Sequence, residues 1–209
     1  LLASLKHPGL PSLIDGGVLD DGAPYLVIER IVGQPIDAYA DQKKLTQRER
    51  VALLRRVAEV VAYAHAQLVL HRDIKPANIL IDDSGRVVLL DFGVAQSLQA
   101  NATATTAGYT LSFAAPEQIR GERNTAATDV YGLAALACKL LSGVSPFGDL
   151  APSAQLRAVL EDAPTLPADL DLDLAAILQR ALRKEASARY ASMAEFDAEL
   201  ERWELNLPV

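Results

Sequence analysis

The sequence has almost no cysteine, no long apolar run and no excess of basic residues. Its 209 residues include one cysteine, so no disulfide can form within the chain and a reducing compartment is its natural setting. No stretch approaches the roughly 18 apolar residues of a membrane-spanning helix. Lys and Arg total 20 against 27 Asp and Glu, a net charge of −7. This balance argues against a nucleic-acid partner, which usually calls for a basic face.

The sequence does not begin with methionine, and we do not expect its start to be a signal peptide. Lys6 and Pro8 interrupt the apolar start, which therefore does not read as a secretory signal. We expect a piece of a longer chain that works in the cytoplasm, either free or as the cytosolic part of a membrane-anchored parent. Half of the residues are apolar, which suits one compact domain with a large core.

Strand patterns come early in the chain and helix patterns come late. One hairpin is predicted over residues 17–32, turning at Asp21-Gly22, and a second over residues 78–90, turning at 82–85. Gly33 and Pro35 end the first pattern. Helices are predicted over residues 47–67, 128–143, 151–161, 172–183 and 192–204. This order favours a mainly helical α+β fold.

Three helix patterns carry further predictions. Thr46 precedes the first helix as a plausible N-cap. The segment 128–143 is apolar on nearly every side, which predicts a central, buried helix ended by Gly143. Met193, Phe196, Leu200 and Trp203 form one stripe at helical spacing. We interpret this stripe as core packing and not as a partner-binding face.

Two motifs carry the chemistry: HRDIKPANIL at residues 71–80, and Asp-Phe-Gly at residues 91–93. Asp73 can accept the proton of an attacking hydroxyl, and Lys75 can neutralise charge on a phosphoryl group in transfer. Asn78 and Asp91 offer hard oxygen ligands for Mg²⁺. Both motifs at this spacing predict phosphoryl transfer from ATP.

With these motifs the chain resembles the catalytic domain of protein serine/threonine kinases. The runs Ala115-Pro116-Glu117-Gln118 and Thr128-Asp129-Val130-Tyr131 make it most similar to the eukaryotic-like kinases of bacteria. The resemblance implies a kinase-like fold, with residues 1–33 as a remnant of the N-lobe sheet and hinge and residues 34–209 as the C-lobe. Most of the N-lobe, including a glycine-rich loop and a strand lysine, is then expected upstream of residue 1.

The resemblance also implies cofactors and partners. They are ATP, Mg²⁺ or Mn²⁺, and a protein substrate with a serine or threonine acceptor, with autophosphorylation in trans as a further expectation. At the hinge, the Glu29 carbonyl and Ile31 amide would meet the adenine edge. Ile28 would lie at the back of the adenine pocket, and Leu80 would form its floor.

Other residues receive regulatory or structural roles from the same resemblance. Arg72 would pair with a phosphate on the activation loop, where Thr103, Thr105 and Thr106 are candidate phosphosites. Thr110 would hydrogen-bond the catalytic aspartate and lysine. Leu2, Leu13, His71 and Phe92 would form a structural stack, and Glu117 and Arg189 a buried ion pair. Asp129 would anchor the backbone of the catalytic loop, the segment at residues 71–78.

Three functions compete at this stage. The first is a serine/threonine kinase, of which this 209-residue chain alone would be impaired without its N-lobe. The second is a pseudokinase that serves as a binding or scaffold module, against which the intact Asp73, Lys75, Asn78 and Asp91 argue. The third is a small-molecule phosphotransferase, disfavoured by Lys75, by the threonine-rich activation loop and by the Ala115-Pro116-Glu117 element.

Overall fold

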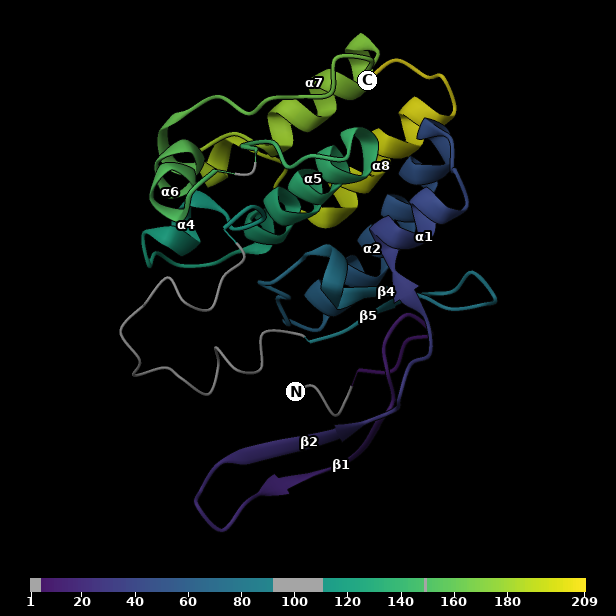
Figure 1. The fold of residues 1–209 in the computed structure, drawn as a ribbon, viewed down its shortest axis with the longest axis vertical. Coiled ribbons are helices and arrows are strands. Elements are labelled where there is room, and N and C mark those ends of the chain that lie inside the picture. The colour runs from purple at the N-terminus through teal and green to yellow at the C-terminus, as the bar shows by residue number, and fades with distance from the viewer. Residues whose placement is uncertain (1–4, 92–110, 149) are drawn as a thin grey trace.

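Two short antiparallel sheets accompany a larger helical body in the computed structural model, which describes residues 5–91, 111–148 and 150–209 (Figure 1). Strands β1 (Leu13–Val18) and β2 (Pro24–Ile28) form a hairpin at one end of the molecule. Strands β3 (Gln34–Pro35), β4 (Ile79–Ile81) and β5 (Val87–Leu89) form the second sheet, in that order. The predicted α+β class, mainly helical, is confirmed.

Helices make up most of the remainder of the described chain. They are α1 (Ile36–Gln42), α2 (Gln47–Ala66), α4 (Pro116–Ile119), α5 (Ala126–Ser142), α6 (Pro152–Glu161), α7 (Leu172–Ala181) and α8 (Met193–Glu204), with 3₁₀ turns η2 (Pro76–Asn78) and η4 (Ala186–Ala188). The five predicted helices are confirmed to within about two residues at each end. Among the described elements, the sequence patterns did not predict strand β3, helices α1 and α4, or the two 3₁₀ turns.

Local chemistry explains where the main helices begin and end. Thr46 caps α2 as predicted: its hydroxyl oxygen accepts from the Glu49 amide at 3.3 Å, and the Glu49 carboxylate accepts from the Thr46 amide at 2.8 Å. Gly143 follows α5 with φ +81°, a left-handed conformation that glycine adopts without a steric penalty. Both predicted boundaries are therefore confirmed.

Helix α5 lies at the centre of the helical body and contacts α2, α7 and α8. Most of its residues are buried, as the pattern over 128–143 predicts. From α8, Met193, Phe196 and Leu200 are buried in the same core, and Trp203 is partly buried against it. The interpretation of this stripe as core packing is confirmed.

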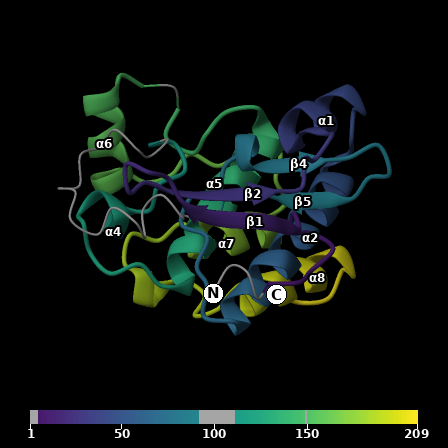
Figure 2. The same ribbon diagram turned by 90° about the horizontal axis from the view of Figure 1, so that it is seen from below.

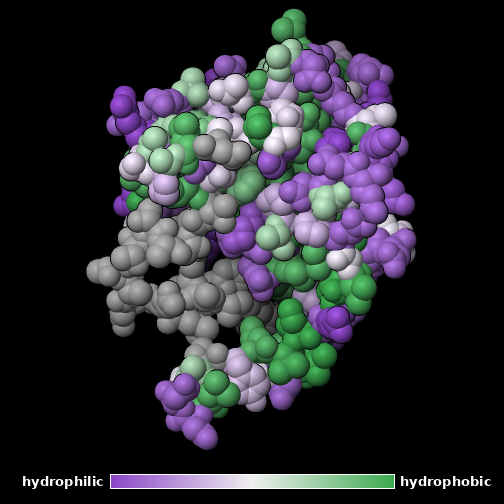
Figure 3. All heavy atoms as spheres, viewed as in Figure 1, coloured by the Kyte–Doolittle hydropathy of each residue, from purple (hydrophilic) through white to green (hydrophobic). Residues whose placement is uncertain are grey.

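The β1–β2 hairpin spans other residues than predicted. It is also more exposed than the core. The predicted span of 17–32 was wrong at both ends. Gly16, Gly17 and a register irregularity between Leu13 and Asp15 obscure the alternating pattern at the start. At the other end, pairing with β1 stops at Ile28, although strand-forming residues continue to Val32. Viewed from below, the hairpin spreads across one end of the body (Figure 2). Its larger apolar side chains are exposed, and hydrophobic surface gathers around this end of the molecule (Figure 3).

The second hairpin follows its prediction closely. Strands β4 and β5 pair from Ile79 with Leu89 to Ile81 with Val87, within one residue of the predicted ends.

No helix in the described ranges combines the length and the hydropathy needed to cross a bilayer. Of the sequence predictions, those for Leu2, Phe92, Thr103, Thr105, Thr106 and Thr110 fall on residues outside the described ranges.

Arg55 joins α2 to α8 through three carboxylates. Its guanidinium nitrogens lie 2.6–3.0 Å from side-chain oxygens of Asp197, Glu201 and Glu204. We expect Arg55→Ala to lower the free energy of unfolding by about 1–3 kcal/mol, since three charge-assisted hydrogen bonds are lost while part of the site remains solvated. Urea denaturation measures this change. Arg48→Ala, at an exposed position of the same helix, is the matched control and should change stability little; equal effects of the two variants would contradict the prediction.

Candidate active site

The loop between α2 and β4 brings Asp73, Lys75 and Asn78 together. Lys75 Nζ lies 2.7 Å from Asp73 Oδ2, and Asn78 Nδ2 donates to the same oxygen at 2.9 Å. Asn78 Nδ2 also donates to the Asp73 carbonyl at 2.8 Å. Neither bond of Asn78 uses its amide oxygen, which is the atom that a hard cation would bind. The cluster therefore combines a carboxylate, an ammonium group and a potential metal ligand.

Asp129, in the first turn of α5, fixes the backbone just before Asp73. Its carboxylate accepts from the backbone amides of His71 at 2.8 Å and Arg72 at 2.7 Å, and lies 2.7 Å from His65 Nε2. The side chain is almost fully buried, and the N-terminus of α5 favours its negative charge. The catalytic loop is thus held from the central helix of the fold.

His71 connects the catalytic loop to the end of β5. Its Nδ1 accepts from the Asp73 amide at 3.2 Å, so the other ring nitrogen, Nε2, carries the proton and donates to the Leu90 carbonyl at 2.9 Å. Burial lowers the pKa of His71 despite the opposing charge of Asp129, which keeps the ring neutral. His71 is fully buried and acts here as a structural residue.

Asp91 comes directly after Leu90, the residue that is bonded to the catalytic loop. The Leu90 amide donates to the Asn78 carbonyl at 2.7 Å, so both backbone polar groups of Leu90 are bonded to the catalytic loop. Asp91 itself is exposed and has φ +51°, a left-handed conformation that aspartate tolerates better than most residues. These bonds therefore place Asp91 next to the loop that carries Asn78.

The donor set suits one kind of cation. Within the described ranges, no group of three or more His, Cys, Asp or Glu side chains could hold a metal ion. Asn78 and Asp91 supply one amide oxygen and one carboxylate. Such a sparse oxygen set fits Mg²⁺, which typically keeps several waters and takes further ligands from substrate phosphates.

The residues assigned to the adenine site lie at the hinge and on β4. Ile28 ends β2, opposite Leu13 of β1, and both are more than one third exposed. The Glu29 amide donates to the Ser12 carbonyl at 2.8 Å, and Ile31 follows in partly buried, irregular backbone. Leu80 lies on the more exposed face of β4, since its neighbours in the strand are buried in the core.

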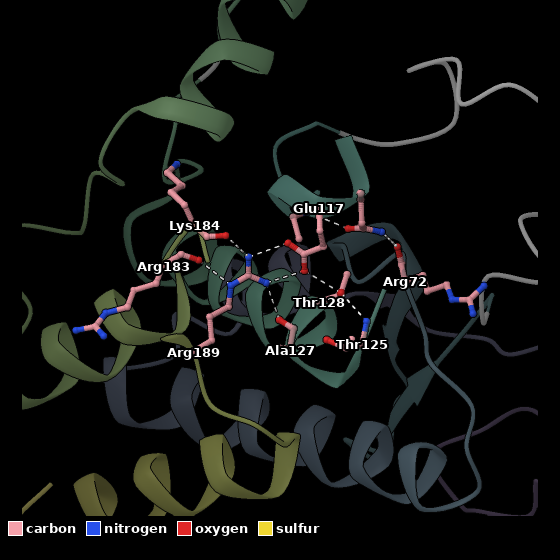
Figure 4. Close-up of polar contacts among 10 residues, drawn as sticks. Arg72, Glu117, Thr125, Ala127, Thr128, Arg183, Lys184 and Arg189 are labelled. Carbon is pink, nitrogen blue, oxygen red and sulfur yellow. Dashed lines mark hydrogen bonds and ion pairs between the residues drawn. The ribbon is translucent and has the colours of Figure 1, made fainter. Parts of the chain in front are cut away.

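Glu117 and Arg189 form a buried ion pair that Figure 4 shows in detail. Both terminal nitrogens of Arg189 bond the Glu117 carboxylate at 2.8 Å. The remaining guanidinium donors reach three backbone carbonyls, those of Ala127 at 2.9 Å, Lys184 at 2.9 Å and Arg183 at 2.7 Å. All five N–H groups of Arg189 are therefore satisfied. The pair ties η4 to α4 and to the start of α5.

Arg72 belongs to the same region, but its side chain points away from this ion pair (Figure 4). Its Nε is buried and has no hydrogen-bond partner among the described residues. A buried guanidinium nitrogen without a partner is unusual and leaves a donor that an anionic group could satisfy.

Two residues at the site escaped the sequence reasoning. His65 received no role at the site, yet its ring reaches Asp129. Gln118 was noted only as part of a motif, yet it is buried and donates to the Arg72 carbonyl at 2.7 Å. Neither contact has a sequence signal, because the partners are 64 and 46 residues apart and only the fold brings them together.

Comparisons with known proteins agree on one family. A family model described as "Protein kinase domain" matches residues 1–198. Serine/threonine-protein kinase PknA of Mycobacterium tuberculosis is 34% identical over 203 residues, which cover 93% of this chain and 47% of the relative. Serine/threonine-protein kinase PknB of the same species is 32% identical over 213 residues, covering 96% of this chain and 34% of the relative.

A third relative comes from another genus. The probable serine/threonine-protein kinase CE0033 of Corynebacterium efficiens is 31% identical over 213 residues, covering 94% of this chain and 32% of the relative. The chain thus spans less than half the length of each of these relatives, although they match nearly all of it.

Proposed function

Since this chain belongs to the protein kinase domain family, we propose that it forms the catalytic part of a serine/threonine kinase that transfers the γ-phosphate of ATP to protein hydroxyls. The observation that carries the proposal is the cluster of Asp73, Lys75 and Asn78, set beside strand β5, which ends two residues before Asp91. Phosphoryl transfer depends on positioning and charge stabilisation more than on covalent chemistry. These four side chains supply both.

Each residue of the cluster has its own step. Lys75 and Asn78 both contact Asp73 Oδ2, so we assign Oδ1 as the oxygen that accepts the proton of the attacking hydroxyl. The Lys75 ammonium offsets the negative charge on the phosphoryl group as it moves. Because Asn78 also binds the Asp73 carbonyl, the carboxylate cannot rotate freely away from the acceptor.

Asn78 and Asp91 would hold Mg²⁺ or Mn²⁺, which when bound neutralises the charge of the ATP phosphates. We propose that the adenine base of ATP binds at the hinge. The Glu29 amide bonds the Ser12 carbonyl. We assign the Glu29 carbonyl and the Ile31 amide to the adenine edge. Ile28 and Leu80 would cover the faces of the ring with apolar surface.

Regulation and partners follow from Arg72 and the threonines. We propose that Thr103, Thr105 or Thr106 is phosphorylated in trans and that the phosphate pairs with the Arg72 guanidinium, whose Nε has no hydrogen-bond partner within the described part of the chain. Thr110 would bond Asp73 and Lys75, and Phe92 would stack with His71, Leu2 and Leu13. The substrate is a protein with a serine or threonine acceptor, and the setting is the cytoplasm, free or beneath a membrane anchor.

The 209-residue sequence contains neither a glycine-rich phosphate loop nor a lysine in a Val-Ala-Ile-Lys context. Both elements position the α- and β-phosphates, so we expect this polypeptide alone to transfer little or no phosphate. The alternative is a pseudokinase that binds partners without catalysis, against which the intact Asp73, Lys75, Asn78 and Asp91 argue.

One experiment tests both functions. ³²P transfer from ATP·Mg²⁺ is measured with the natural chain, including any residues that flank these 209, and with the 209-residue polypeptide. The proposal is supported if serine or threonine is labelled by the natural chain but not by the 209-residue polypeptide. Mapping of the label within residues 94–110 tests the phosphosites. A folded natural chain that binds nucleotide but transfers no label would replace the proposal with the pseudokinase alternative. Equal transfer by the short polypeptide would refute its predicted impairment.

A further inference from the structure

The backbone of the catalytic loop is strained immediately before Asp73. Arg72 has φ +68°, a left-handed conformation that residues other than glycine rarely adopt. The backbone conformation of Arg72 determines the direction in which the chain enters Asp73. Such a conformation persists only where the surrounding structure holds it. The residues that hold Arg72 therefore bear directly on the position of the catalytic carboxylate.

Two side chains hold the Arg72 peptide from opposite sides. The Arg72 amide donates to Asp129 Oδ1 at 2.7 Å, and the Arg72 carbonyl accepts from Gln118 Nε2 at 2.7 Å. Asp129 comes from α5 and Gln118 from α4, so the two anchors belong to different elements. Gln118 is 6% exposed, which protects its bond from competition with water.

The orientation of the Gln118 amide is fixed by its second contact. Gln118 Oε1 accepts from the Ala115 amide at 2.9 Å. A flipped amide would place its NH₂ group against the Ala115 N–H and its oxygen against the Arg72 carbonyl, and both contacts would be repulsive. The nitrogen must therefore point to Arg72. Gln118 bridges the start of α4 and the catalytic loop in one direction only.

We propose that Gln118 is a positioning residue that holds the left-handed Arg72 peptide and thereby orients Asp73 for proton acceptance. The inference rests on the proposed kinase function for its catalytic consequence. Gln118, Arg72 and Asp73 also line one small cavity, together with Asp129 and Thr128 of α5. A change at Gln118 thus lies next to the catalytic aspartate without occupying the site of a substrate or metal ligand.

Gln118→Glu tests the proposal in the natural chain, because it keeps the shape of the side chain but removes the donor. At neutral pH the carboxylate faces the Arg72 carbonyl, and we expect kcat to fall about tenfold with little change in KM for ATP. The charged groups of this cavity are Arg72, Asp73 and Asp129. Burial beside two carboxylates favours the protonated glutamic acid, which donates again. The kcat ratio of variant to wild type should therefore rise as the pH falls.

Two further variants separate positioning from simple loss of packing. Gln118→Leu cannot regain a donor, so its kcat ratio should stay low at every pH. Gln155→Glu is the matched control: Gln155 is also a buried glutamine whose amide nitrogen donates, but its partners are Ser112 and Gly148 and not the catalytic loop. Recovery in acid for Gln118→Glu but not for Gln118→Leu is the expected result. Wild-type kcat in Gln118→Glu, or an identical pH profile in Gln118→Leu, would overturn the proposal.

Hydrogen exchange provides a readout that does not depend on activity. We expect the peptide that contains the Arg72 amide to exchange about tenfold faster in Gln118→Leu, and at the wild-type rate in Gln155→Glu. If the wild type transfers no phosphate, the proposed function fails while this measurement still tests the anchor. If the wild type is active and exchange at Arg72 is unchanged in Gln118→Leu, the anchor alone is refuted.

Discussion

Asp73→Asn is expected to lower the rate of phosphotransfer by about 10²- to 10⁴-fold while the protein stays folded. The amide keeps the shape of the carboxylate and can still accept from Asn78 and Lys75, which lie 2.9 and 2.7 Å from Asp73 Oδ2. An amide is, however, too weak a base to take the proton of the attacking hydroxyl. The loss should therefore appear in kcat, with KM for ATP nearly unchanged. The measurement is steady-state transfer of labelled phosphate by the natural chain.

A second aspartate provides the control for this prediction. Asp83 lies in the exposed turn between β4 and β5, so Asp83→Asn makes the same chemical change away from the cluster. We expect wild-type kcat from Asp83→Asn. Activity of Asp73→Asn within threefold of wild type would remove Asp73 from the role of proton acceptor and would leave the cluster with a purely electrostatic function.

The sequence predicted which residues of the site lie together, but not the tertiary contacts that hold them in place. Asp73, Lys75 and Asn78 lie within six residues of one another, so their proximity follows from local chain geometry, and the structure places them in contact. The same holds for the long helices, whose apolar period and caps are local signals. Glu117 and Arg189 are 72 residues apart, and the structure brings them together where only the family resemblance had suggested a pair.

Other features depend on tertiary contacts that leave no local signal. Strand β3 has two residues, one of them Pro35, and exists only because it pairs with β4. The hairpin was misplaced because Gly16 and Gly17 have low strand propensity, while cross-strand pairing with β2 overrides that preference. The anchoring roles of His65 and Gln118 likewise depend on segments far away in the sequence. Local patterns predict elements, whereas the precise support of a site comes from their packing.

Removal of either partner of the Glu117–Arg189 pair is expected to lower the free energy of unfolding by about 3–5 kcal/mol. Both side chains are buried, so Glu117→Gln leaves an uncompensated guanidinium and Arg189→Met leaves an uncompensated carboxylate. This loss is a large share of the roughly 5–15 kcal/mol that stabilises a typical domain. Glu122→Gln, at an exposed position near the end of α4, is the control. Urea denaturation of the three variants measures the effect, and equal stability of Glu117→Gln and Glu122→Gln would contradict it.

The pH dependence of this stability distinguishes the charge interaction between Glu117 and Arg189 from other effects of the substitution. Burial alone would raise the pKa of Glu117, but the hydrogen bonds and charge of Arg189 outweigh burial and lower the pKa below its ordinary value of 4.5. A lowered folded-state pKa gives stabilisation that is present above pH 4.5 and is lost as the pH falls through the folded-state pKa. Glu117→Gln lacks this contribution at every pH. The stability difference between wild type and Glu117→Gln should therefore be largest near neutral pH and shrink in acid, whereas a difference that grows in acid would show that Arg189 does not hold Glu117 ionised.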